Sequence, residues 1–312
     1  MVKAILLIVL GFILLIKGAD FLVDGASDIA KKLHIPEIII GLTIVSIGTS
    51  MPELFVSTKA ALEGSADISL GNIIGSNICN LLLILGLSAF IKPVKFQKET
   101  IKIEIPMCLG ITILFFILCN TGKMLSRVEG ILFLHLFLMF ILYTIYMGTQ
   151  GDNKFSFGRE KKISLPKSIL LLLLGIVGLK YGGDFTVDNA VYIAQRLNIS
   201  EKIISMTVLA IGTSLPELVT SVTAAIKGDS DIAIGNVIGS CIFNILLIIG
   251  LSAAITPLTY NVSYNIQMFT LMFAMILLAI FPFIKPKNVM SRFNGLVYLI
   301  AYIGYMIVLF II

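Results

Sequence analysis

Gly41-Leu-Thr-Ile-Val-Ser-Ile-Gly-Thr-Ser-Met-Pro-Glu53 is a motif that the chain contains twice. Its second copy runs Thr207-Val-Leu-Ala-Ile-Gly-Thr-Ser-Leu-Pro-Glu217, so the two glutamates lie 217 − 53 = 164 residues apart. At this single offset, and without a gap, 28 of the 47 residues from 43 to 89 recur from 207 to 253. Self-similarity over such a length indicates that the chain consists of two related halves.

The same offset relates the segments that precede the two motifs. Four residues of the N-terminal segment, Gly11, Gly18, Asp20 and Asp24, recur as Gly175, Gly182, Asp184 and Asp188. The apolar run that follows Lys3 therefore has a twin in the middle of the chain. We expect this run to be a structural helix rather than a cleaved signal peptide.

Composition places this repeat in a membrane. Hydrophobic residues make up 58% of the 312 residues and charged residues only 13%, against about 25% charged in a typical soluble domain. The mean hydropathy is +1.03, and runs such as Ile266–Ile284 approach the ~20 apolar residues that cross a bilayer. The basic residues behind the net charge of +5 lie between the apolar runs, which favours loops at a membrane surface over a nucleic-acid interface. We predict an all-α integral membrane protein that binds no nucleic acid.

The apolar segments predict ten transmembrane helices, five in each half. The first half comprises 2–33, 36–63, 67–91, 101–120 and 126–148, and the second comprises 166–197, 200–227, 231–256, 263–284 and 290–312. We expect residues 1–148 to form the first five-helix repeat and residues 165–312 the second, with a polar linker at 149–164. The recurring segments of about 36–91 and 200–256 form the core of each repeat.

An odd number of helices per half inverts the second repeat in the bilayer, which is a recurring design in secondary transporters. The ends and loops after the odd-numbered helices hold 15 Lys and Arg residues, and the opposite face holds six. Because loops rich in Lys and Arg remain in the cytoplasm, we expect the linker 149–164 to be cytoplasmic. Both termini of this multi-pass cell-membrane protein are then extracellular.

Glu53 and Glu217 fall inside predicted membrane helices. An ionised carboxylate there costs about 2.5–3.5 kcal/mol on insertion scales, so two at equivalent positions indicate a bound cation. Pro52 and Pro216 have no N–H, which deprives the carbonyl oxygens four residues earlier of a helical partner. A freed carbonyl at membrane depth requires a polar cavity or a cation. The alternative explanation for the two glutamates is that they form hydrogen bonds only with neighbouring polar side chains. The alternative explanation for the two prolines is a simple kink in the helix.

Neutral oxygen donors accompany the glutamates at helical spacing. A stripe with steps of 3, 4, 3 and 4 along one continuous helix comprises Thr43, Ser46, Ser50, Glu53 and Ser57. In the next helix and its twin, steps of four relate Asn72, Ser76 and Asn80, and then Asn236, Ser240 and Asn244. Oxygen donors suit Ca²⁺ and Na⁺ and do not select a soft metal. The alternative is that these polar side chains form hydrogen bonds between helices and do not bind a cation.

The two Gly-Thr-Ser-x-Pro-Glu segments, each followed by Gly-Asn-x-Ile-Gly-Ser, resemble the paired α-repeats of the cation/Ca²⁺ antiporter superfamily, and within it the Na⁺/Ca²⁺ exchanger family. The similar layout covers essentially the whole chain, which lacks the large Ca²⁺-sensing insert of animal exchangers. The resemblance implies ten helices, of which the second, third, seventh and eighth enclose the ions. The first and sixth would slide across this core to alternate access.

By position, the resemblance also implies a set of ion ligands. The implied side chains are Glu53, Glu217, Thr49, Ser50, Thr213, Ser214, Ser76, Ser240, Asn80 and Asn244, joined by the backbone carbonyls of Ser46 and Ala210. K⁺-dependent members resemble this chain but carry Asp where it has Asn244. This residue therefore favours K⁺ independence.

Together these features predict a secondary active antiporter that exchanges Na⁺ for Ca²⁺ by alternating access. The resemblance implies three Na⁺ per Ca²⁺ and hence electrogenic transport. H⁺/Ca²⁺ exchange, K⁺-dependent Na⁺/Ca²⁺ exchange and, more distantly, a passive Ca²⁺ channel are the alternatives. The chain has no HExxH or GxSxG motif, so we expect no enzymatic activity. We expect no cofactor and no protein partner, only the transported ions and the lipid bilayer.

Overall fold

The helices of the first half follow the predicted segments but contain more breaks. The computed structural model describes residues 1–149, 164–197 and 210–311. The first half contains α1 (Val2–Leu33), α2 (Glu37–Ile40), η1 (Gly41–Val45), α3 (Ser46–Thr49), α4 (Met51–Leu62), α5 (Ala66–Ile78), η2 (Cys79–Leu85), α6 (Gly86–Ile91), η3 (Thr100–Glu104), α7 (Ile105–Gly122) and α8 (Arg127–Thr149). The elements η1, η2 and η3 are π-helical turns inside longer helical spans.

The second half repeats this pattern where it is described. It contains α9 (Leu165–Arg196), α11 (Ala210–Thr213), α12 (Leu215–Lys227), α13 (Ser230–Phe243), η5 (Asn244–Ile249), α14 (Gly250–Ile255), η6 (Val262–Tyr264), α15 (Asn265–Ile280), η7 (Phe281–Phe283) and α16 (Arg292–Ile311). The element η5 is a π-helical turn, and η6 and η7 are 3₁₀ turns. Most of the predicted linker and residues 198–209 of the second half lie outside the described residues.

The prediction of an all-α membrane protein is confirmed. Within the described residues, eight helical spans are long and apolar enough to cross a bilayer. The bent pair Glu37–Thr49 and Met51–Leu62 is a ninth when it is counted as one span. The remaining predicted helix, 200–227, is described only from Ala210 onwards. The total of ten helices and the inversion of the second half stay predictions.

Four short strands were not predicted. β1 (Val94–Lys95) pairs antiparallel with β4 (Val289–Met290), and β2 (Met124–Leu125) pairs with β3 (Leu258–Thr259). Each two-stranded ribbon takes one strand from each half of the chain. The 164-residue offset carries Val94 onto Leu258 and Leu125 onto Val289, and so relates one ribbon to the other. The two halves are therefore joined by equivalent pairings in their loops.

Two spans form the centre of the molecule. The share of buried residues in the most apolar stretch is 94% in the span Ser230–Ile255 and 78% in the span Ala66–Ile91. In the other six spans that pass the same test, the share is only 22–39%. Glycine permits this close packing: a Cβ atom on Gly239 would lie 2.6 Å from the carbonyl oxygen of Leu42 in η1. Polar side chains on the two central spans are therefore shielded from lipid by the outer helices.

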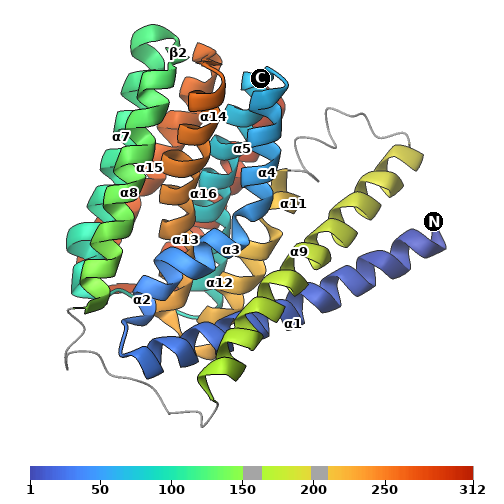
Figure 1. Cartoon of the computed structure of the whole chain (residues 1–312), viewed down its shortest axis with the longest axis vertical. Helices are drawn as coiled ribbons and strands as arrows, with labels where there is room; N and C mark the ends of the chain where they lie inside the picture. Colours follow the sequence, from blue (N-terminus) through green and yellow to red (C-terminus); the bar gives the residue numbers. More distant parts are fainter. Residues whose placement is uncertain (150–163, 198–209, 312) are drawn as a thin grey trace.

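Helices α1 and α9 form a separate pair that runs obliquely across the bundle of the other helices (Figure 1). Their backbones touch at three glycines of α1. A Cβ atom would lie 2.8 Å from the backbone nitrogen of Leu179 at Gly18, and 2.7 Å from that of Leu172 at Gly25. At Gly11 it would lie 2.4 Å from Oγ1 of Thr186. Because the contact is between backbones along the whole crossing, we expect the pair to behave as one body.

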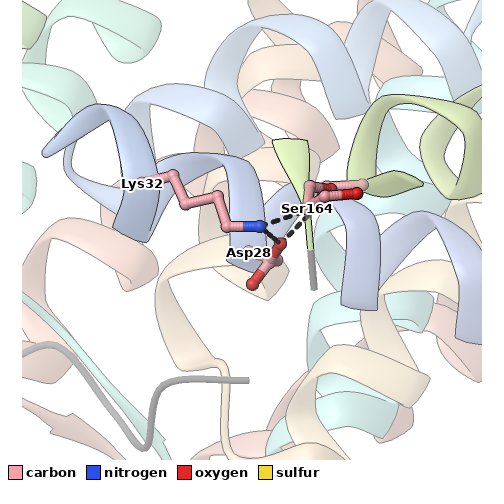
Figure 2. A network of polar contacts seen from close by, with 4 residues as sticks. Asp28, Lys32 and Ser164 are labelled. Carbon is pink, nitrogen blue, oxygen red and sulfur yellow. Dashed lines mark hydrogen bonds and ion pairs between the residues drawn. The ribbon is translucent and has the colours of Figure 1, made fainter. Parts of the chain in front are cut away.

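A polar network joins the same two helices at the C-terminal end of α1 (Figure 2). The Nζ of Lys32 donates to Oδ2 of Asp28 at 2.7 Å, and the hydroxyl of Ser168 in α9 donates to the same carboxylate. The hydroxyl oxygen of Ser168 also lies 3.1 Å from the carbonyl oxygen of Ser164. The pair is thus tied by hydrogen bonds where the glycine contacts end.

Candidate ion-binding site

The helix that carries Glu53 is broken one turn before the carboxylate. Helix α3 ends at Thr49, Ser50 has the non-helical angles φ −83° and ψ 9°, and α4 begins at Met51 with its axis turned by 53°. Pro52 lies in the first turn of α4, where its missing N–H leaves no gap in the hydrogen bonds of that helix. Glu53 therefore lies at a helix N-terminus, whose partial positive charge favours a carboxylate.

The second half builds the same break. Helix α11 ends at Thr213, Ser214 has φ −88° and ψ 8°, and α12 begins at Leu215 with Pro216 in its first turn. Both glutamates are 1% exposed. Each lies where one short helix ends and the next begins, as in transporters that hold ions between discontinuous helices.

The two glutamates exchange partners between the halves. The hydroxyl of Ser50 donates to Oε1 of Glu217 at 2.7 Å, and its oxygen lies 2.9 Å from the hydroxyl oxygen of Ser240. Conversely, the hydroxyl of Ser214 donates to Oε1 of Glu53 at 3.3 Å, and its oxygen lies 3.4 Å from the hydroxyl oxygen of Ser76. The Ser76 hydroxyl lies 3.4 Å from the same Glu53 oxygen. These six predicted ligands thus form two hydrogen-bonded groups of three, each of which joins residues of both halves, and the contacts are shorter in the group that contains Glu217.

Each glutamate helix also packs on the π-helical turn of the opposite half. Helix α4 contacts η5, which begins at Asn244, and α12 contacts η2, which contains Asn80. Both asparagines are 1% exposed. π-Helical turns inside α-helices occur frequently at functional sites. The predicted amide ligands are therefore contributed to the region where the two halves meet.

Several oxygen atoms in this cluster are buried and accept no hydrogen bond. Among the described residues these include Oε2 of Glu53, Oε2 of Glu217, Oδ1 of Asn80 and Oδ1 of Asn244. Neither carboxylate forms an ion pair with a described side chain. Buried acceptors without a partner are rare in folded proteins and require a specific explanation. A cation is the partner that would satisfy carboxylate and amide oxygens together.

The threonine and carbonyl ligands implied by the resemblance differ in whether they already have a hydrogen-bond partner. The Thr49 hydroxyl donates to Oδ1 of Asn236 at 3.0 Å, whereas Oγ1 of Thr213 has no partner among the described residues. The Ser46 carbonyl already accepts the Ser50 amide at 3.0 Å and lies 3.3 Å from the Thr49 hydroxyl. Ala210 is the first residue described after the gap. The ligand roles of all four residues stay predictions.

The predicted continuous stripe on the second span is wrong at its start. The π-helical turn η1 and the break at Ser50 change the direction of the side chains, because the spacing argument requires one unbroken α-helix. The Thr43 hydroxyl donates to the carbonyl oxygen of Ile39 at 2.6 Å. Thr43 lines a separate groove of about 720 Å³ that Thr144 of α8 also borders.

Two buried asparagines outside the implied ligand set contribute contacts to the site: Asn236, which belongs to the predicted polar stripe, and Asn77, which the sequence analysis did not single out. Oδ1 of Asn236 accepts a hydrogen bond from the Thr49 hydroxyl, and its Nδ2 donates one to the Ser221 hydroxyl at 2.9 Å. Asn77 receives Nδ2 of Asn244 at 2.9 Å. A signal for Asn77 was available, because the 164-residue offset pairs it with Cys241 and so breaks the symmetry of the repeat.

The donor set restricts the chemistry of the site. Within the described ranges, no group of three or more His, Cys, Asp and Glu side chains is placed to hold a metal ion. The cluster instead combines two carboxylates with hydroxyl and amide oxygens. Such a mixture suits hard cations of the Ca²⁺ and Na⁺ type and offers nothing to a soft metal.

Comparison with known proteins identifies close relatives over the full length. The family model described as "Sodium/calcium exchanger protein" matches residues 3–146 and 167–311. The putative antiporter CaxA of Alkalimonas amylolytica is 38% identical over 99% of both chains. The sodium/calcium exchanger MaX1 of Methanosarcina acetivorans is 33% identical over 98% of both. A solved structure of the sodium-calcium exchanger NCX_Mj, soaked with Na⁺ and Ca²⁺, superposes with a TM-score of 0.86 at 34% identity and covers 97% of both chains.

Proposed function

The chain belongs to the sodium/calcium exchanger family, and from this premise we propose that it exchanges Na⁺ for Ca²⁺ across a membrane by alternating access. The observation that carries the proposal is the buried cluster around Glu53 and Glu217, whose carboxylate and amide oxygens lack partners among the described residues. The ligands are the twelve residues that the family resemblance implies.

Charge balance explains why the two ions compete. Two ionised carboxylates give the unloaded site about two negative charges, and neither has a cationic side chain as partner among the described residues. Burying such charges without a partner costs several kcal/mol each. One Ca²⁺ offsets both charges, and Na⁺ ions bound to the same oxygens offset them in its place. Antiport follows if the protein changes orientation only with its charges neutralised.

Three further properties belong to this proposal. Transport is electrogenic if three Na⁺ replace one Ca²⁺, as the family resemblance implies. It is independent of K⁺, because Asn244 provides a neutral amide where K⁺-dependent relatives carry a carboxylate. The linker 149–164 is cytoplasmic and the termini are extracellular, as the distribution of Lys and Arg predicts.

Ca²⁺ uptake into proteoliposomes loaded with Na⁺ tests the exchange. We expect uptake to follow an imposed Na⁺ gradient, to be unaffected by K⁺, and to increase when the negative potential that builds up inside the vesicles is dissipated, because three positive charges leave for every two that enter. Uptake that persists after the Na⁺ gradient has collapsed would contradict Na⁺ coupling. Uptake driven by a pH gradient without Na⁺ would instead identify H⁺/Ca²⁺ exchange.

Glutamine substitutions test the site. We expect Glu53→Gln and Glu217→Gln each to reduce uptake to background, because each removes one of the two charges that hold Ca²⁺. Glu104 provides a control that is not among the predicted ligands: it is also 1% exposed in a membrane span, and its Oε2 likewise lacks a partner among the described residues, but its Oε1 accepts a hydrogen bond from the hydroxyl of Tyr143 on α8 at 2.7 Å. Glu104→Gln should retain uptake within about twofold. Normal uptake by either of the first two variants would refute the assignment.

A further inference from the structure

A chain of hydrogen bonds leads from a backbone carbonyl to one of the proposed ligands. The amide Nδ2 of Asn77, on α5, donates to the carbonyl oxygen of Cys241 on α13 at 3.4 Å. Its Oδ1 receives Nδ2 of Asn244 at 2.9 Å. The remaining oxygen of Asn244, Oδ1, is buried and has no partner among the described residues. All three residues are at most 1% exposed.

The direction of this chain is determined by its first member. A backbone carbonyl can only accept a hydrogen bond. Asn77 must therefore turn its NH₂ group toward Cys241 and its oxygen toward Asn244. Facing an acceptor, Asn244 must in turn present its own NH₂ group to Asn77. Its carbonyl oxygen then faces away from Asn77. The turn η5, which begins at Asn244, packs on the helix α4 that carries Glu53.

We propose that Asn77 is a positioning residue that holds the Asn244 amide with its oxygen directed at the cation site. This inference rests on the proposed function, because it requires Asn244 to be a ligand. An amide turned by 180° would present its NH₂ group to the ion, so that an attractive ligand would become a repulsive one. Asn77 prevents this rotation without touching the ion itself.

The twin position is built differently, so the two site amides are not equivalent. The 164-residue offset places Cys241 opposite Asn77, and the Cys241 thiol only approaches the Asn77 carbonyl oxygen at 3.9 Å. A cysteine has no amide oxygen to receive the NH₂ group of Asn80, the twin of Asn244. The described residues contain no hydrogen bond to the Asn80 amide that corresponds to the one that orients Asn244. Within the described part of the chain, the Asn244 amide is thus held in a set orientation by a hydrogen bond that the Asn80 amide lacks.

Kinetics of Na⁺-driven Ca²⁺ uptake in proteoliposomes test this role. We expect Asn77→Leu, which has a similar volume but no hydrogen-bonding groups, to raise the KM for Ca²⁺ about tenfold, the lower end of the 10–100-fold effect of removing a partner that orients a metal ligand. The Vmax should stay within about twofold. Cys241→Ala, at the twin position, should leave both parameters within about twofold. A lower Vmax with an unchanged KM for Asn77→Leu would overturn the proposal.

Double variants separate orientation from packing. Asn244→Ala alone should raise the KM, and adding Asn77→Leu should raise it no further, because no amide remains to be oriented. In an Asn244→Asp background Asn77→Leu should also have less than a twofold effect, since a carboxylate presents an oxygen either way. A KM increase that persists in both backgrounds would refute the positioning role. Asn77→Ala replaces Asn77→Leu in each comparison if the larger side chain prevents folding.

The outcomes distinguish this inference from the function on which it rests. If the unmodified protein shows no Na⁺-driven uptake, or if Asn244→Ala leaves the KM unchanged, the proposed function or its ligand set is wrong, and the positioning role falls with it. If the unmodified protein exchanges the ions and Asn244→Ala raises the KM while Asn77→Leu does not, the positioning role alone is wrong.

Discussion

At the residue scale, the two glutamates are not held alike although their motifs are nearly identical. Glu217 receives the Ser50 hydroxyl at 2.7 Å, whereas the hydroxyls near Glu53 lie at 3.3 and 3.4 Å. Hydrogen bonds to a carboxylate are stronger when they are short. The pseudo-symmetric site therefore has a more tightly bonded half, and its shortest contact, between Ser50 and Glu217, joins the two repeats.

This asymmetry predicts unequal effects of matched serine variants. We expect Ser50→Ala to raise the Ca²⁺ KM about tenfold, which corresponds to the ~1.5 kcal/mol of a hydrogen bond to a charged group. Ser214→Ala removes only the longer contacts and should raise the KM about threefold or less. The measurement is Na⁺-driven Ca²⁺ uptake at graded Ca²⁺ concentrations. Equal effects of the two variants, or a larger one for Ser214→Ala, would show that the asymmetry does not govern ion binding.

At the element scale, glycine has opposite consequences in different helices. Glycine in a helix interior normally costs about 0.5–1 kcal/mol relative to alanine, because the unfolded chain is more flexible. In α1 this cost is offset by the approach of α9, which no residue with a Cβ atom would permit at Gly18. A Cβ atom added at Gly110 in α7 would have no described atom of another part of the chain within 4 Å. The same residue type is thus required in one helix and replaceable in another.

Alanine at these two glycines should change stability in opposite directions. Gly18→Ala places a methyl group 2.8 Å from the Leu179 nitrogen and 3.0 Å from the Gly175 oxygen. Backbone atoms cannot move aside easily, so we expect a loss of about 1–3 kcal/mol and a lower Tm. Gly110→Ala should leave the Tm unchanged or raise it. Thermal unfolding of the purified proteins in detergent provides the comparison, and a similar Tm for both variants would contradict close contact between α1 and α9.

At the scale of the whole molecule, ion pairs connect the α1–α9 pair to the remaining bundle. Lys227, the last residue of α12, lies 3.0 Å from Oδ1 of Asp20 and 3.1 Å from Oδ1 of Asp24 on α1. Beyond these, Glu37 of α2 receives the Ser27 hydroxyl at 2.7 Å. If α1 and α9 slide across the core during transport, as the family resemblance implies, the contacts of Lys227 must break in each cycle.

Removal of the Lys227 contacts should therefore accelerate exchange. These groups are about one quarter to one third exposed, so the pairs contribute about 1 kcal/mol or less. We expect Lys227→Gln to raise the Vmax of Na⁺-driven Ca²⁺ uptake by about two- to fivefold with little change in KM. Lys59→Gln is the control, because Lys59 of α4 pairs at 3.9 Å with Glu63, the residue that follows the same helix, and both are well exposed. A Vmax that Lys227→Gln leaves unchanged or lowers would contradict this role.

Several properties followed from the amino-acid sequence by itself: the duplication, the membrane environment, the extent of nearly all described spans and the two intramembrane acids. These properties depend on composition, on the length of apolar runs and on self-similarity. All three can be determined from the order of the residues without knowing which of them meet in space. The helix break next to each glutamate was also indicated by Pro52 and Pro216, since proline is disfavoured inside a helix and favoured in its first turn.

Only the tertiary structure decided which groups meet. It paired Ser50 with Glu217 rather than with the nearby Glu53, placed Asn77 against Asn244, and joined the loops of the two halves in short ribbons. Helical spacing could not predict these contacts, because it orders side chains along one helix and fails where a π-helical turn or a bend interrupts it. The partners lie 167 residues apart in both side-chain pairs. Their meeting depends on how two similar halves interlock, which no periodicity within either half encodes.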